Sequence, residues 1–256
     1  MLRDNITEQG ITSGFSVLDE ADEKVIKSQA IEELFDWYSK NDYEKISVLY
    51  DRFCMKDHKP LVNLILSVDK FLSSVAISRD WLKKTVFEYK KDFCDSVYYN
   101  RFFENMLKKI RTALNLSKEN QKLIKDVCED SESAKAKKAT DKINNDYKRT
   151  KLLYDIAEER RMPTEAEYSF ICAFEDFKGF RADDKAVWGI CLAKRKKLKD
   201  IVKSSATVLI SAESDFYETG YVTELLTEAV EKFRQIVWEK KCSKNSISFD
   251  DGERLC

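Results

Sequence analysis

The densest group of side chains able to do chemistry is a run of cations in AKRKKLKD, between Ala193 and Asp200. Five of the six positions from 194 to 199 carry a positive charge: Lys194, Arg195, Lys196, Lys197 and Lys199. On a helix these side chains spread over most of the circumference, so about three of them could meet one line of DNA phosphates. Such contacts give affinity and salt dependence but do not read sequence. A solvated, lysine-rich face is the alternative, and the sequence leaves both open.

A second, more diffuse set of cations lies upstream. It comprises Lys135, Lys137, Lys138, Lys142, Lys148, Arg149 and Lys151. This set is the other candidate for a DNA-contacting face.

Motifs for nucleotide hydrolysis and for covalent or metal catalysis are missing from the sequence. It contains no GxxxxGK[ST] phosphate loop, no GxGxxG and no GxSxG. The single histidine, His58, allows neither a Ser/His/Asp triad nor a two-histidine metal site, and the 7 cysteines form no CxxC. Acidic pairs such as Asp183–Asp184 and Asp250–Asp251 are typical of solvated helix ends. We therefore expect no catalytic residue, no bound metal and no cofactor in this chain.

The composition limits the class of protein and its compartment. Lys and Arg number 45 against 46 Asp and Glu, which excludes a uniformly basic nucleic-acid binder but permits a local basic face. An odd, scattered set of cysteines favours reduced thiols. No apolar run approaches the roughly 18 residues of a membrane span, and no signal-peptide pattern opens the sequence. We expect a cytoplasmic protein without membrane contact.

The elements that position these cations are predicted to be helices. Glycine is absent between Gly14 and Gly179, and only 2 prolines occur, so tight turns are few. The pattern predicts an all-α, irregular multi-helix bundle. The expected helices cover 19–38, 46–53, a segment starting at Pro60, a segment starting at Ser78, 108–130 with a break near Ser117, 133–161, 164–179, 183–204, and a last segment after Gly220. Weak heptad spacing over 133–161 predicts one long charged helical arm that packs on a narrow side.

Both ends of the chain carry a recognisable pattern. The first segment, GITSGFSVLDEADEKVIKSQAIEELF at Gly10–Phe35, precedes the apolar helix and Trp-Leu pair of Leu61–Lys84. The last contains a lysine-bearing helix followed by SISFDDGERLC at Ser246–Cys256. The residues concerned are Gly10, Phe15, Val17, Asp19, Glu20, Glu32, Glu33, Leu34, Phe35, Trp81, Leu82, Phe233, Lys240, Lys241, Ile247, Phe249, Asp250, Asp251, Glu253, Arg254 and Leu255.

In this pattern the chain resembles the 1B insertion segment of UvrD/RecB-like superfamily I DNA helicases, and within them the AddA-type helicase–nuclease subunit. The match covers about 1–85 and 225–256, and Gly252 departs from the usual leucine. The resemblance implies a piece of a larger enzyme, with entry from the ATPase domain over 1–15, a helical insertion over 16–245 and re-entry over 246–256.

The resemblance also implies what the chain does. The parent would be an ATP-dependent helicase using ATP and Mg, while this segment contacts double-stranded DNA and is itself inactive. Its partners would be the remaining domains of the parent and a second helicase–nuclease subunit. The two ends should then lie together, make few contacts with the helical body, and leave Phe249 and Leu255 exposed. A helical protein–protein interaction module without a DNA role is the alternative.

Overall fold

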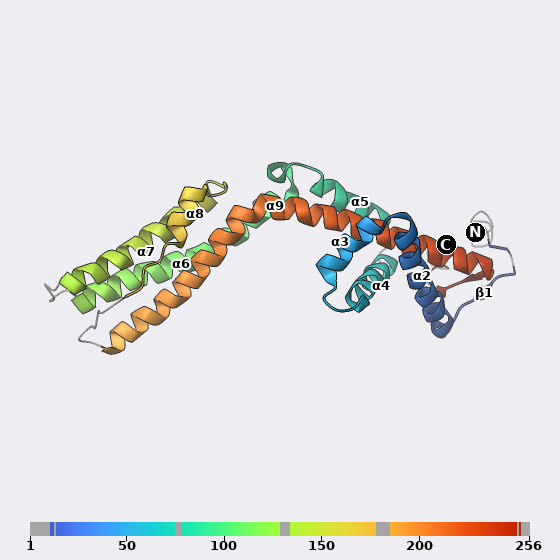
Figure 1. The fold of residues 1–256 in the computed structure, drawn as a ribbon, viewed down its shortest axis with the longest axis horizontal. Coiled ribbons are helices and arrows are strands. Elements are labelled where there is room, and N and C mark those ends of the chain that lie inside the picture. The colour runs from blue at the N-terminus through green and yellow to red at the C-terminus, as the bar shows by residue number, and fades with distance from the viewer. Residues whose placement is uncertain are drawn as a thin grey trace. The chain divides into compact units, whose positions relative to one another are not determined.

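The computed structural model describes residues 11–12, 14–74, 78–128, 134–177, 185–249 and 251. In this part of the chain there are eight α-helices and two strands of two residues each (Figure 1), which confirms the predicted all-α multi-helix fold. The chain divides into two compact units. Unit 1 comprises Met1–Lys90 and Tyr217–Cys256, and unit 2 comprises Lys91–Phe216. The span expected as one insertion, 16–245, is therefore shared between the two units.

Unit 1 is built from the first four helices and the end of the last one. These are α2 (Glu20–Asn41), α3 (Tyr43–Phe53), α4 (Lys59–Ser74), α5 (Ser78–Tyr89) and the C-terminal part of α9 (Lys185–Ser243). Asp19 caps α2 as predicted, because its carboxylate accepts a hydrogen bond from the backbone N–H of Asp22. The core includes the fully buried Leu34, Ile65 and Phe233.

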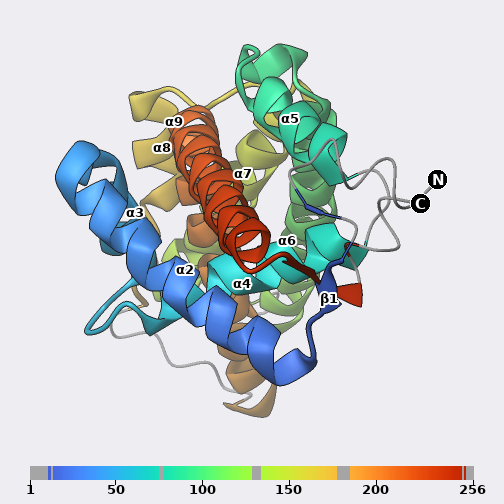
Figure 2. The same ribbon diagram turned by 90° about the vertical axis from the view of Figure 1, so that its right-hand side faces the viewer.

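Two short segments near the ends of the described chain pair in unit 1 as parallel strands (Figure 2). Ser16 of β1 (Ser16–Val17) is paired with Ser246 of β2 (Ser246–Ile247), and the backbone N–H of Leu18 donates to the carbonyl of Ile247 at 2.8 Å. The expected proximity of the two end segments is confirmed for their described residues. The expected lack of contacts is wrong, because Ile11 and Ile247 are buried together beside Phe15, Trp238 and Cys242.

A buried lysine fixes the segment that follows β2. The ammonium of Lys241 in α9 donates to the Ser248 hydroxyl at 2.9 Å and to the Asp251 carboxylate at 2.5 Å. Burial opposes ionisation of Asp251, but the charge and hydrogen bonds of Lys241 lower the pKa of that carboxyl overall. Phe249 lies between these contacts yet is 72% exposed, as predicted, whereas Leu255 lies outside the described residues.

Unit 2 is a bundle around two long helices that run side by side in Figure 1, α6 (Val97–Cys128) and α7 (Ala134–Glu158). The 3₁₀ turn η1 (Phe93–Asp95), α8 (Glu165–Cys172) and the N-terminal part of α9 complete it. The predicted long charged helix is α7, and its heptad positions Ala136, Ile143, Thr150 and Ala157 are buried. The predicted break near Ser117 is wrong, because α6 continues through this buried serine.

Two further predicted boundaries differ from the structure. The capping box of Thr164 and Glu167 is present, but α8 ends at Cys172 instead of Gly179, since Ala173 leaves the helical region at ψ 57°. The helices predicted on either side of Gly220 are one helix of 59 residues, α9. A glycine is tolerated inside a helix at modest cost, and Gly220 serves packing there.

A polar layer divides the core of unit 2. It consists of Ser117, Asn120, Asp146, Arg149, Thr150 and Arg195, all buried. On one side of the layer lies the larger apolar cluster, which includes Ala113 of α6, Leu153 of α7 and Leu198 of α9. On the other side lies a smaller cluster, which includes Ile124 of α6, Ile143 of α7 and Cys191 of α9. The layer therefore crosses all three helices between two apolar clusters.

Candidate nucleic-acid interface

Three lysines form a line along one side of α9 in unit 2. Lys196, Lys199 and Lys203 are separated by three and four residues, a spacing that places side chains next to one another on one face of a helix. Lys196 and Lys203 are exposed and make no ion pair with any described residue. We call these three residues the lysine ridge. Lys203 was not among the cations singled out in the sequence, although its position four residues after Lys199 would have indicated it.

Arg195 is buried and is therefore unavailable to DNA. Its guanidinium donates to the Asp146 carboxylate from Nε at 2.6 Å and to the Glu175 carbonyl oxygen at 2.6 Å. Burial raises the pKa of Asp146, and the hydrogen bonds and charge of Arg195 oppose that rise. The predicted DNA contact of Arg195 is replaced by a structural role in the polar layer.

The two other predicted cations of α9 differ from the ridge. Lys194 is partly exposed and pairs with Glu119 of α6. Lys197 is exposed, but it follows Lys196 directly and so lies about 100° around the helix from it. Two of the five predicted cations, Lys196 and Lys197, are therefore exposed without an ion pair to a described residue, and Lys199 is partly exposed and paired with Asp176.

The upstream set of cations on α7 is divided in the same way. Arg149 is buried, donates to the Phe170 carbonyl at 3.0 Å and lies 5.1 Å from the centre of the Phe170 ring. Lys151 pairs with Asp155 in its own helix. The side chains of Lys137, Lys138 and Lys148 are exposed, and that of Lys135 lies outside the described part. Lys142 alone joins the α9 cations, through the segment described next.

The segment Ala173–Phe177, which we call the strap, follows α8, has no regular secondary structure and contacts both α7 and α9. The ring of Phe177 lies 4.3 Å from the guanidinium carbon of Arg195, a cation–π contact. The Lys142 ammonium donates to the Asp176 carbonyl at 2.6 Å and lies 3.4 Å from the Glu175 carboxylate. The Asp176 carboxylate in turn lies 3.8 Å from the ammonium of Lys199. The strap thus brings Lys142, from the second predicted set, to the middle of the lysine ridge.

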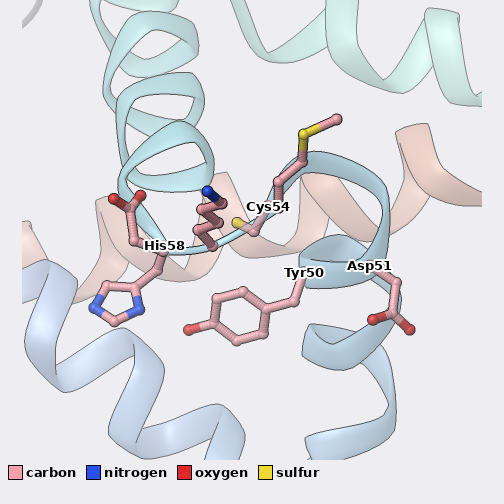
Figure 3. Close-up of a pocket in the computed structure, with 7 residues that line it drawn as sticks. Tyr50, Asp51, Cys54 and His58 are labelled. Atoms are coloured by element: carbon pink, nitrogen blue, oxygen red, sulfur yellow. The ribbon is translucent and has the colours of Figure 1, made fainter.

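A shallow depression in unit 1 contains the only histidine of the chain (Figure 3). It has a volume of about 230 Å³ and lies at the α3–α4 connection, where Tyr50 and His58 point toward each other, their ring centres 6.4 Å apart. This is smaller than the usual range for ligand sites, about 300–1,000 Å³. Among the described residues there is no group of three or more His, Cys, Asp or Glu side chains that could hold a metal ion.

Comparison with known proteins does not assign the chain to a family. No protein-family model matches it, and no curated protein is significantly similar to it in sequence. The resemblance to helicases therefore depends on the residues quoted above. Within the described residues, no helix combines the length and the apolar composition that crossing a membrane requires.

Proposed function

We propose that this chain is a duplex-DNA-contacting accessory domain of an ATP-dependent helicase of the UvrD/RecB-like superfamily, closest to the AddA-type subunit. The observation that carries the proposal is the lysine ridge. Lys194, Arg195 and Lys199 of α9 each pair with an acidic side chain. Lys196 and Lys203, which precede and follow Lys199 along the ridge, are exposed and make no ion pair with a described residue. A line of cations that spans two helical turns suits successive phosphates of a DNA backbone.

The pairing of the two chain ends supports the insertion part of the proposal. An inserted domain leaves its host and returns to it at neighbouring points, and β1 and β2 are hydrogen-bonded neighbours in parallel orientation. Phe249, two residues after the end of β2, is an apolar side chain 72% exposed, as expected of a residue that contacts another domain. On this proposal, ATP and Mg bind to the other domains of the parent helicase. A second helicase–nuclease subunit is a further partner, and the whole enzyme works in the cytoplasm.

The proposed mechanism is electrostatic. Phosphates of the duplex replace their condensed counterions with the lysine ammonium groups, so affinity falls as salt rises. Three ridge lysines predict a slope of about −2.7 for log K against log salt, at 0.9 for each neutralised phosphate. Chemistry and strand separation belong to the parent, and this domain holds duplex DNA in place for them.

The test is duplex binding by the purified chain, measured by fluorescence anisotropy at several salt concentrations. Changing Lys196→Ala and Lys203→Ala together should weaken binding and reduce the slope by about 1.8, since two phosphate contacts are lost. The control is Lys24→Ala with Lys40→Ala in α2, two exposed lysines of unit 1. An equal loss in both double variants, or no loss in the ridge variant, would show that the ridge is not the DNA contact.

The interaction-module alternative is favoured by one observation in unit 1. The rings of Phe71 and Trp81 lie 5.4 Å apart, and both side chains are about half exposed, at 48% and 49%. Exposed aromatic side chains are enriched in protein interfaces. A chain that binds no duplex even at low salt would favour this second function over the first.

A further inference from the structure

We propose that the strap carboxylates of Glu175 and Asp176 occupy the places that DNA phosphates take, so that the free protein partly blocks its own lysine ridge. The inference rests on the proposed function and adds a regulatory element to the same site. The partner is duplex DNA, recognised through its phosphate backbone.

The positions of the two carboxylates carry the inference. Asp176 lies 3.8 Å from Lys199, the central lysine of the ridge, and Glu175 lies 3.4 Å from Lys142 of α7. A carboxylate and a phosphate are both anions that accept hydrogen bonds from an ammonium group. The strap therefore places two negative charges beside two cations, one from each of the two candidate sets that the sequence offered for a DNA-contacting face.

The exposure of these ion pairs shows that they can exchange. The side chains of Glu175 and Asp176 are 54% and 75% exposed, and surface ion pairs contribute only about 0–1 kcal/mol each. A DNA strand that brings several phosphates to the ridge can replace both carboxylates at small cost. The buried pair of Arg195 and Asp146 is different, because separating it would leave a charge without a partner.

The backbone of the strap need not move in this exchange. Its other attachments include the Glu175 carbonyl bound to Arg195, the Asp176 carbonyl bound to Lys142, and the Phe177 ring on the Arg195 guanidinium. None of these uses the carboxylates. The proposed exchange is a rotation of two exposed side chains away from their lysines, after which Lys142 and Lys199 contact phosphate.

The experiment compares the whole wild-type chain with the double variant Glu175→Gln and Asp176→Asn, using a 20-base-pair duplex as the probe. These substitutions keep the shape of each side chain and remove its charge. Binding should tighten by about threefold to thirtyfold, the equivalent of up to about 1 kcal/mol for each of two surface pairs. Adding Lys142→Ala and Lys199→Ala to the strap variant should remove this gain.

A matched control separates local competition from net charge. Glu32→Gln with Asp36→Asn makes the same change in net charge on exposed positions of α2 in unit 1, and should leave affinity nearly unchanged. An equal gain in both variants, or no gain in the strap variant, overturns the inference. If the wild-type chain binds through Lys196 and Lys203 but the strap variant gains nothing, only the strap inference fails. If neither chain binds duplex, the proposed function fails with it.

Discussion

The backbone of Gly220 lies so close to α5 that a Cβ atom at position 220 would be 2.8 Å from the Cβ of Tyr89. Real Cβ atoms do not approach this closely, and the Cβ of Tyr89 can move only with its backbone. Gly220 is therefore a packing residue that lets α9 and α5 approach each other within unit 1.

Changing Gly220→Ala should therefore destabilise the protein, although alanine favours a helix more than glycine does. We expect a net loss of about 1–2 kcal/mol, from an overpacking cost of about 1–3 kcal/mol offset by a helix-propensity gain of up to about 1 kcal/mol. The measurement is urea unfolding followed by circular dichroism. The control is Gly189→Ala in the same helix, where no atom lies within 4 Å of the added Cβ and stability should rise.

Removing the charge of Arg195 should be among the most damaging single changes in unit 2. Arg195→Met leaves the buried carboxylate of Asp146 with only the more distant Arg149, at 3.7 Å, so we expect a loss of about 3–5 kcal/mol. The double variant Arg195→Met with Asp146→Leu should recover most of it. Lys197→Met, an exposed neighbour, should shift the thermal midpoint little. A mild effect of Arg195→Met would contradict the structural role given to this residue.

Asn120 offers the opposite prediction. Its side chain is fully buried, and neither its oxygen nor its nitrogen has a hydrogen-bond partner among the described residues. Replacing it with leucine, of similar volume, removes an unpaired polar group that costs about 1–3 kcal/mol, so Asn120→Leu should stabilise the protein. Asn115→Leu at an exposed position of α6 should change stability by less than about 0.5 kcal/mol. Destabilisation by Asn120→Leu would mean that the amide is satisfied in solution.

The start of α8 should depend on pH through Glu167. Hydrogen bonds from Arg161 and from the backbone of Thr164 lower the pKa of this carboxyl from 4.5 to about 2. Because the pKa is lowered by folding, the stabilisation is complete above about pH 4.5 and is lost as the pH falls toward 2. NMR titration of the carboxyl should show the low pKa directly. The protection factors for hydrogen exchange in α8, which are rates relative to the unprotected amide at the same pH, should fall in acid. Glu167→Gln should lower these protection factors at neutral pH and change them little in acid.

Local signals in the sequence predicted the fold class and several element boundaries. Asp19 and the Thr164–Glu167 pair marked helix starts because their side chains bond to backbone N–H groups nearby in the chain. The boundary at Gly220 was mispredicted because a glycine can either end a helix or allow close packing inside one. Only the position of Tyr89, distant in sequence, shows that Gly220 allows close packing between α9 and α5.

The candidate site shows the same limit. The five cations around Lys196 were visible as a cluster, but their individual roles depend on Asp146, Glu119 and Asp176, which come from other elements. Pattern alone cannot tell that Arg195 is buried while Lys196 is exposed, because adjacent positions on a helix face different neighbours. The role of the strap was missed altogether, since 173–177 had been predicted as helix.

The composition of unit 1 from two distant stretches of chain has a consequence for synthesis on the ribosome. Residues up to Lys90 emerge before unit 2, but their core needs Leu225, Ala229 and Phe233, which are made after all of unit 2. Unit 2 is one continuous stretch, Lys91–Phe216, so its helices can pack together as soon as they have been synthesised. During translation the apolar faces of α2 to α5 therefore stay exposed until the end of α9 leaves the ribosomal exit tunnel and packs against them. A nascent chain stalled before position 217 should thus bind chaperones through α2 to α5.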